Sequence, residues 1–249
     1  MICASIGESS IEDCISALGK VGFAEVRLDS ISGIGVGDVR RIFSLSSSGK
    51  KLIATCRKEA CAGCGIAQDG GSAGSGRGAH DCAGGRSAGK ILDDSLRKEL
   101  LLAAIDSGAA YVDLEVEMAE GMRKEIADRA KERGCKLIVS FHDFSGTPKR
   151  EELGKIVERC FSCGADVAKI ACMVDSQQDN ARLLGLLGEW KGLIVIGMGK
   201  KGRSTRVLAP LLGAEFTFAS LGGKTAPGQM ELGKMREIIE RIEDELETD

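Results

Sequence analysis

The chain has 249 residues, 43% of them hydrophobic, with a formal net charge of −3 and a pI near 5.7. A chain this long and apolar can bury a substantial core, and the lack of a basic block argues against nucleic acid or an anionic membrane as a partner. The N-terminus has no cationic start before an apolar segment, and no apolar run reaches the roughly 18 residues of a membrane span. These features indicate a cytoplasmic protein.

Short β-type runs alternate with helical patterns along the whole chain. The predicted strands are residues 2–6, 23–28, 51–57, 111–117, 136–142, 166–173, 192–198 and 216–221. The predicted helices are residues 9–21, 36–46, 93–108, 119–134, 149–164, 177–190, 204–213 and 231–247. Eight βα units predict one α/β domain over residues 1–249 with a (βα)8 TIM-barrel fold, and a doubly wound open sheet is the alternative.

An insertion over residues 58–89 separates the third predicted strand from its helix. It is rich in Gly, Ala, Ser and Cys, which predicts a flexible loop over the face of the barrel where active sites lie. Cys61, Cys64, His80 and Cys82 within it have a spacing that could complete a zinc site, but their Gly-rich surroundings do little to fix the ligand geometry. We therefore predict no metal.

Without a signal peptide, the ten cysteines are best interpreted as mostly reduced core residues.

Charged residues alternate with apolar ones in strands that a parallel sheet would bury on both faces. If the apolar rows face the helices, the polar rows point into the barrel and those near the strand ends point toward its mouth. The alternative is a buried ion-pair network without function. The polar rows comprise Glu25, Arg27, Asp29, Arg57, Asp113, Glu115, Glu117, Ser140 and His142.

One lysine, Lys169, lies inside the apolar stretch GADVAKIACMV at residues 164–174. A buried ammonium is costly unless it is paired or loses its proton. An inward Lys169 would lie beside His142, because adjacent strands are about 4.8 Å apart. Burial and neighbouring arginines favour the neutral amine, which attacks carbonyl groups, and His142 can then remove the proton that the iminium acidifies.

Two loops in the last third of the chain suit an anionic ligand. The stretch GMGKKGRSTRVLAP at residues 197–210 runs into a helix whose first turns offer free N–H groups and Arg206, which suit a carboxylate or phosphate. The stretch LGGKTAPGQM at residues 221–230 carries Thr225 and Gln229, polar groups able to close over a ligand. An ordinary loop with a proline turn is the alternative for the second.

The motifs EVRLD, TCR, DLE, SFHDF, AKIA, GKKGRSTR and TAPGQ, taken in order, resemble those of the type I 3-dehydroquinate dehydratases. The resemblance covers nearly the whole chain. It implies a (βα)8 fold without a metal or organic cofactor, often as a homodimer. It also implies a carbon–oxygen lyase of the shikimate pathway that removes water from 3-dehydroquinate, giving 3-dehydroshikimate for aromatic amino-acid biosynthesis.

The resemblance also implies roles for individual residues. Lys169 would form an imine with the substrate ketone, and His142 would take the C2 proton and later protonate the departing C1 hydroxyl. Arg206 would hold the carboxylate. The other implied contacts are Glu25, Arg27 and Arg57 to the ring hydroxyls, and Thr225 and Gln229 in the closing loop.

The acid that usually follows the third-strand arginine in this family, and orients the histidine, is displaced here. Asp69 of the DGG motif is our candidate, with Glu59 as an alternative and absence as a third possibility. Two other functions stay open from the residues alone. A class I aldolase also needs a barrel lysine, and a regulatory or structural barrel could hold zinc in the inserted loop.

Overall fold

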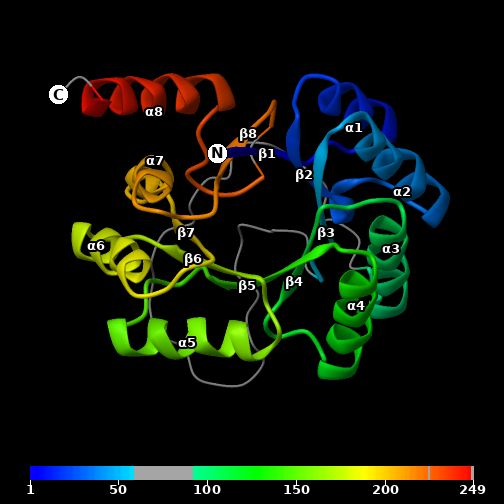
Figure 1. The fold of residues 1–249 in the computed structure, drawn as a ribbon, viewed down its shortest axis with the longest axis horizontal. Helices are drawn as coiled ribbons and strands as arrows, with labels where there is room; N and C mark the ends of the chain where they lie inside the picture. Colours follow the sequence, from blue (N-terminus) through cyan, green and yellow to red (C-terminus); the bar gives the residue numbers. More distant parts are fainter. Residues whose placement is uncertain (59–91, 224, 248–249) are drawn as a thin grey trace, which may run out of the picture.

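The computed structural model describes residues 1–58, 92–223 and 225–247, in which parallel strands and helices alternate (Figure 1). The strands are β1 (Ile2–Ile6), β2 (Phe23–Arg27), β3 (Lys51–Thr55), β4 (Tyr111–Glu115), β5 (Lys136–Asp143), β6 (Val167–Met173), β7 (Leu193–Met198) and β8 (Thr217–Ser220). The α-helices are α1 (Ile11–Leu18), α2 (Val36–Phe43), α3 (Asp94–Asp106), α4 (Glu120–Glu132), α5 (Arg150–Ser162), α6 (Gln177–Gly185), α7 (Arg203–Leu211) and α8 (Leu232–Glu247). Short 3-10 helices cover Leu28–Ser30, Ser44–Ser48 and Leu186–Gly188. The predicted alternation of strands and helices is confirmed.

The strand order identifies a barrel. The sheet runs β7-β6-β5-β4-β3-β2-β1-β8, and β1 pairs in parallel with both β2 and β8. On the remaining side, the N–H of Glu215 donates to the carbonyl of Leu193 at 2.8 Å, which joins the start of β8 to β7. Figure 1 shows the strands around a centre with the helices outside them. Pairing of the first strand with the last excludes the doubly wound sheet, so the (βα)8 prediction is confirmed.

Several helices begin at residues that cap them. Ser10, Asp93 and Ser176 accept hydrogen bonds from backbone N–H groups three residues ahead, at 3.1, 2.9 and 3.3 Å. These side chains satisfy donors that the first helical turn leaves free. The starts of these three helices are thereby fixed locally.

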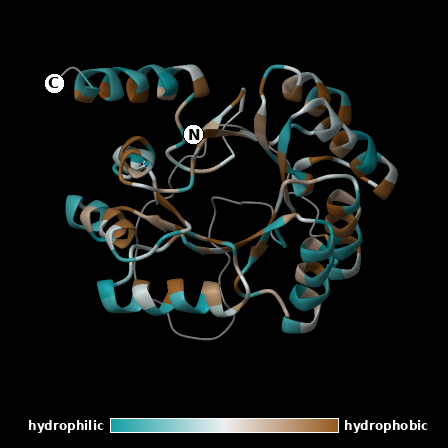
Figure 2. Ribbon diagram, viewed as in Figure 1, coloured by the Kyte–Doolittle hydropathy of each residue, from teal (hydrophilic) through white to brown (hydrophobic). Residues whose placement is uncertain are grey.

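The apolar rows of the strands face the helices, as predicted. They form the larger core cluster with the inner faces of the helices, and Figure 2 shows hydrophobic strands surrounded by helices whose outer faces are hydrophilic. A second apolar cluster fills the inside of the barrel, toward the strand N-termini on β1 to β5 and along the length of β7 and β8 as far as Met198 and Phe218. Its aromatic rings pack edge to face, with Phe216 4.9 Å from Phe23 and 5.6 Å from Tyr111 between centroids. We call this second cluster the interior plug; its residues include Cys3, Phe23, Ile53, Tyr111, Ile138, Val167 and Phe216, which directly precedes β8.

Two residues further along the strands, the interior becomes polar. Because side chains on one face recur every second residue, each of six plug residues is followed by a polar one on the same face. All six of these polar residues are buried. We call them the polar layer: Ser5, Glu25, Thr55, Asp113, Ser140 and Lys169.

Some sequence predictions fall outside the described residues. These are Asp69, Glu59 and the possible zinc residues Cys61, Cys64, His80 and Cys82. Seven cysteines are described, all with free thiols, and only Cys163 among them is not buried. None of the described helices combines the length and apolarity that crossing a membrane requires.

Candidate active site

Lys169 reaches across the inside of the barrel. Only 5% of this residue is exposed, and its Nζ lies 2.9 Å from Oδ2 of Asp113 on β4 and 3.6 Å from Oε1 of Glu25 on β2. The amine also lies 4.3 Å from the centroid of the Phe218 ring on β8. Contacts to three other strands place the nitrogen in the middle of the polar layer.

The charged groups that touch Lys169 differ from those expected. The sequence argument placed arginines beside the amine, whereas the structure places two carboxylates there. The register sets Lys169 opposite Ser140 on the neighbouring strand, whereas the two carboxylates come from β4 and β2, which do not pair with β6. Attack on a carbonyl requires a nitrogen with a free electron pair, and these two carboxylates are the charged groups nearest to it.

Asp113 is the centre of the charge network. Its Oδ2 accepts a hydrogen bond from Arg57 at 2.8 Å as well as from Lys169, and its Oδ1 accepts one from Ser140 at 2.6 Å. Arg57 also donates to the Ser140 hydroxyl at 2.8 Å, which closes a triangle. Burial by itself would raise the pKa of Asp113, but Arg57 and Lys169 hold it well below its usual range.

Glu25 is held on both of its oxygens. Oε2 accepts from the Ser5 hydroxyl at 2.6 Å, and Oε1 accepts from Thr55 at 3.1 Å. Burial acts to raise the pKa of Glu25, but Lys169 and Arg27 outweigh it, so the pKa is lowered. Glu25 is therefore a carboxylate at neutral pH and can only accept hydrogen bonds.

His142 follows the polar layer at the end of β5. It lies two residues beyond Ser140, opposite Ala171 of β6, and its ring stacks on that of Phe144 with 6.3 Å between centroids. Burial, followed by the charges of Arg57 and Lys169, lowers its pKa well below the usual value. From sequence we expected a pKa near neutrality. The structure instead makes His142 a neutral imidazole at neutral pH, which is the form that accepts a proton.

Arg27 and Arg57 are oriented by acidic partners at the strand ends. Asp29, in the 3-10 turn after β2, accepts from Nε and Nη2 of Arg27 at 3.0 and 2.6 Å. The same carboxylate accepts the backbone N–H of Arg57 at 3.2 Å. A two-point contact fixes the plane of a guanidinium, so Asp29 orients the Arg27 side chain. Through the backbone of Arg57 it also fixes the end of β3.

Arg206 of α7 is almost completely buried, with 1% exposure. Its Nη1 donates to the carbonyl of Phe218 at 3.3 Å and its Nη2 to that of Pro227 at 3.2 Å, while Nε has no hydrogen-bond partner among the described residues. Burial, with a smaller contribution from Arg203, lowers its pKa to about 10. No described carboxylate forms an ion pair with this guanidinium, so it is suited to receive an anion.

Thr225 and Gln229 are engaged with one another in the loop after β8. The Gln229 side-chain oxygen accepts from the N–H of Thr225 at 2.7 Å and of Ala226 at 3.2 Å. Its Nε2 donates to the Thr225 hydroxyl at 2.9 Å. The loop is thus braced by the two side chains that the sequence assigned to substrate binding.

Several site residues received no individual role from the sequence. Asp113 stood in a predicted polar row without one, although it contacts Lys169 directly. The alternation of polar and apolar residues could have identified the missed residues. Each of them lies two positions from a residue with a predicted role, or on a strand that pairs with the strand of such a residue. The residues concerned are Ser5, Asp29, Thr55, Asp113 and Ser140.

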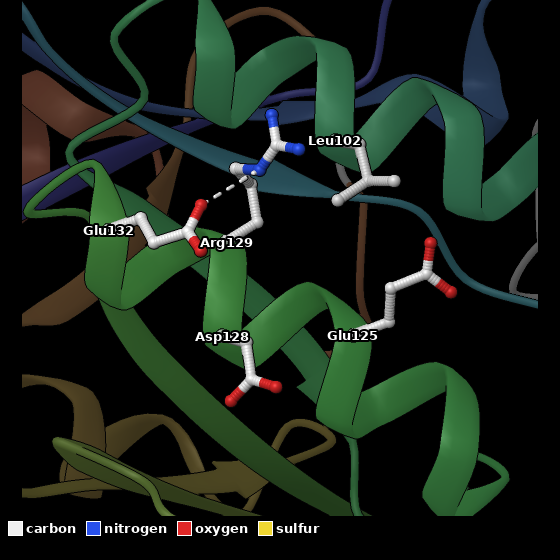
Figure 3. Close-up of a pocket in the computed structure, with 5 residues that line it drawn as sticks. All are labelled: Leu102, Glu125, Asp128, Arg129 and Glu132. Carbon is white, nitrogen blue, oxygen red and sulfur yellow. Dashed lines mark ion pairs between the residues drawn. The ribbon is translucent and has the colours of Figure 1, made fainter.

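Two hollows on the described surface lie outside the polar layer. One of about 210 Å³ lies between α3 and α4 and is lined by Leu102 with Glu125, Asp128, Arg129 and Glu132 (Figure 3). Arg129 there pairs with Glu132 at 3.3 Å. The four charged residues all lie on α4, on the outside of the barrel, so this hollow is separate from the interior site. The other, of about 400 Å³, borders the end of β4 near Glu115 and Arg97.

The fold and the site define a (βα)8-barrel enzyme with a buried lysine and a neutral histidine near the C-terminal ends of its strands. Residues 2–245 match a family model described as Type I 3-dehydroquinase. The 3-dehydroquinate dehydratase of Methanococcus maripaludis strain C6 is 32% identical over 254 residues, covering 98% of this chain and 100% of that protein. The chain belongs to the type I 3-dehydroquinase family, and it is a hydro-lyase of the shikimate pathway.

Solved structures of the same family share the fold. A type I 3-dehydroquinate dehydratase from Clostridium difficile superposes with a TM-score of 0.78 at 21% identity, covering 98% of this chain and 92% of that one. The enzyme from Geobacillus kaustophilus gives a TM-score of 0.74 at 24% identity, with coverages of 98% and 91%. At these identities the superpositions support the barrel and leave the roles of individual residues to this chain's own geometry.

Proposed function

We propose that Lys169 and His142 dehydrate 3-dehydroquinate to 3-dehydroshikimate through a lysine imine. The observation that carries the proposal is the Lys169 amine, buried inside the barrel and held between Asp113 and Glu25. Burial of an amine costs free energy, so a role in packing alone does not explain its presence here. Its position on the strand next to a neutral imidazole suits covalent catalysis on a ketone.

The reaction balances with these two side chains. The neutral amine of Lys169 adds to the C3 ketone, and the adduct takes up one proton and loses one water to give an iminium; the final hydrolysis returns this proton. His142 then takes the C2 proton, and the C–H electron pair moves into the ring to form an enamine. The enamine expels the C1 hydroxyl, which leaves as water with the proton from His142. Hydrolysis of the new iminium consumes one water and releases the amine, so the net change is the loss of one water.

Arg206 would hold the substrate carboxylate. Its guanidinium is buried and has an Nε without a partner in the described part of the chain. A carboxylate placed there gains charge-assisted hydrogen bonds and neutralises a buried cation. This contact would fix the end of the ring from which the hydroxyl departs.

The remaining predicted contacts surround the amine. Glu25, Arg27 and Arg57 would bind the ring hydroxyls, since their strands end around Lys169. Thr225 and Gln229 would contribute from the loop after β8. Asp69 stays a prediction as the acid that orients His142, and replacement by Asn should lower the catalytic rate constant kcat with little change in KM.

Borohydride trapping tests the imine directly. Reduction in the presence of 3-dehydroquinate should fix the mass of the substrate on Lys169, as read by mass spectrometry of peptides. Lys169→Met should give no adduct, whereas Lys131→Met, which removes an exposed amine on α4, should be labelled like the unaltered protein. A folded, unaltered protein that gains no mass under these conditions would contradict the proposal.

The expected assembly follows from the resemblance, and the expected location and partners follow from the charge and hydropathy of the sequence. We propose a cytoplasmic homodimer that binds a small substrate and neither nucleic acid nor a membrane. Light scattering after size-exclusion chromatography should give twice the 26.2 kDa of one chain. A monomeric mass at micromolar concentration would contradict the dimer.

A further inference from the structure

A chain of hydrogen bonds runs from the loop after β8 to the carboxylate beside Lys169. It begins at Gln229, whose side-chain oxygen accepts the backbone N–H groups of Thr225 and Ala226. Because the oxygen is committed to these donors, the amide nitrogen faces the Thr225 hydroxyl, to which it donates at 2.9 Å. The orientation of the Gln229 amide is therefore determined by its surroundings.

The direction of the next two hydrogen bonds is also determined. Ser5 Oγ lies 2.6 Å from Oε2 of Glu25 and 2.7 Å from Oγ1 of Thr225. Glu25 is ionised and can only accept, so the single hydroxyl proton of Ser5 points to it. Ser5 is then left to accept from Thr225, and the Thr225 hydroxyl lies closer to Ser5 Oγ, at 2.7 Å, than to its other acceptor, Oε1 of Gln229, at 3.2 Å. Every donor in the chain thus points from Gln229 toward Glu25.

The chain ends at the amine. The other oxygen of Glu25 accepts from Thr55 at 3.1 Å and lies 3.6 Å from Nζ of Lys169. With Ser5 on one oxygen and Thr55 on the other, the carboxylate cannot rotate without breaking a hydrogen bond to a charged group. The charged groups that act on Glu25 are Lys169, Arg27, Asp113, Arg57 and Arg206.

The backbone is shaped to seat Thr225 on Ser5. The register sets Ser5 opposite Glu25 on β2 and Ser220 on β8. Gly7, two residues further along, leaves the space that Thr225 fills, since a Cβ on Gly7 would come within 2.5 Å of the Thr225 methyl carbon. Any other residue at position 7 would displace Thr225 from the serine.

We propose that Ser5 is a positioning residue, which uses this ordered chain to hold the Glu25 carboxylate against the Lys169 amine and ties that alignment to the seated loop. The inference rests on the proposed function, because it takes Lys169 as the reacting amine. Ser5 itself is buried without exposure, and its only hydroxyl proton is spent on Glu25. Its effect on the reaction therefore passes through Glu25.

Replacement of the two hydroxyls tests the chain. Ser5→Ala should lower kcat roughly tenfold to a hundredfold, the equivalent of a hydrogen bond to a charged group, with a smaller change in KM. It should also move the acid limb of the kcat profile to higher pH, since Ser5 is among the groups that lower the pKa of Glu25. Thr225→Val should produce a similar but smaller loss. The double variant should lose little more than Ser5→Ala, because the two residues act through one chain.

Thr217→Val is the matched control. Thr217 is a buried threonine on β8 whose hydroxyl has no hydrogen-bond partner in the described ranges, so the same isosteric change should leave kcat and the pH profile unaltered. The role of Ser5 would be overturned if the losses of kcat in the two single variants were additive in the double variant. It would also be overturned if Ser5→Ala left kcat and the pH profile unaltered. Borohydride trapping separates this from the proposed function: Ser5→Ala should still be labelled at Lys169, whereas failure of the unaltered protein to be labelled rejects the imine itself.

Discussion

On β1 to β6, the two halves of the barrel interior are built from the same strands and differ by two residues along each, whereas on β7 and β8 the interior stays apolar. Toward the strand N-termini, the interior plug packs Phe23, Tyr111 and Phe216 edge to face. One step toward the C-termini, the same faces carry the polar layer, with Asp113 and Lys169 in direct contact. The plug gains from burial of apolar area, whereas the polar layer retains charges that burial penalises.

This difference indicates how the barrel separates stability from chemistry. Charges in the polar layer are tolerated because each has a partner, as the contacts of Asp113 show. The interior plug excludes water from the side of the polar layer that faces the strand N-termini. The strands fix the positions of the plug and of the polar layer. The two halves should therefore respond in opposite ways to substitution.

Lys169→Met is expected to have the largest effect on the reaction. Turnover should fall by at least about a thousandfold, because no other amine can form the covalent intermediate. A steady-state assay of enone absorbance measures it, and turnover close to that of the unaltered protein would contradict the assignment.

The same variant also tests stability. In the structure the change leaves Glu25 with fewer partners, so the melting temperature should fall. The loss should be less than the about 3–5 kcal/mol of a fully broken buried pair, since Arg57 still pairs with Asp113.

Phe216→Ala should act on stability instead. Truncation of this buried ring is expected to cost about 3–5 kcal/mol in the free energy of unfolding, measured in urea, while kcat of the folded fraction stays nearly unchanged. Leu212→Ala, at a residue with 54% exposure, should change the stability by no more than about 0.5 kcal/mol. A large fall in kcat of the folded Phe216 variant would show that the two halves are not separable.

Asp113→Asn should affect both properties. It removes the charge that Lys169 and Arg57 share, so kcat should fall roughly tenfold to a hundredfold and the melting temperature should fall with it. Asp106→Asn is the matched control, because Asp106 forms its ion pairs with Arg129 and Arg133 on the helix surface. Equal effects of the two variants in kinetic and thermal assays would count against a special role for Asp113.

The pH dependence should give the smallest effect. Because the pKa of His142 is lowered, kcat/KM should hold as pH falls through about 6.5 and decline only in more acid solution. Arg57→Gln should move this limb upward by up to roughly one pH unit, since Arg57 contributes to the lowering. Arg133→Gln, which changes an exposed arginine, is the control and should leave the acid limb of the profile unchanged. A limb at or above the ordinary histidine value in the unaltered protein would contradict the neutral imidazole.

The free energy of unfolding should also decrease in acid, because the buried acidic groups and His142 have lowered pKa values in the fold. Asp113 and Glu25 have lowered pKa values in the fold, so their contribution is present above the unfolded pKa of about 4 and is lost as pH falls below it. His142 acts in the same direction, because the unfolded chain takes up its proton first. Urea unfolding at several pH values measures this slope.

The sequence by itself determined the eightfold alternation, the outward apolar rows and the family. Each depends on local periodicity or on motif order, which the chain carries without reference to its fold. The inward position of Lys169 could also be predicted, because a charged residue within an apolar strand is costly to bury unless it is paired or takes part in chemistry.

Only the tertiary structure decided which groups meet. The register that sets Lys169 opposite Ser140, and the contacts across the barrel to Asp113 and Glu25, join residues from strands far apart in the chain. The expected arginine neighbours were replaced by carboxylates for this reason. The ordered chain through Ser5 likewise depends on β8 closing against β1, a pairing between the two ends of the sequence that no local pattern records.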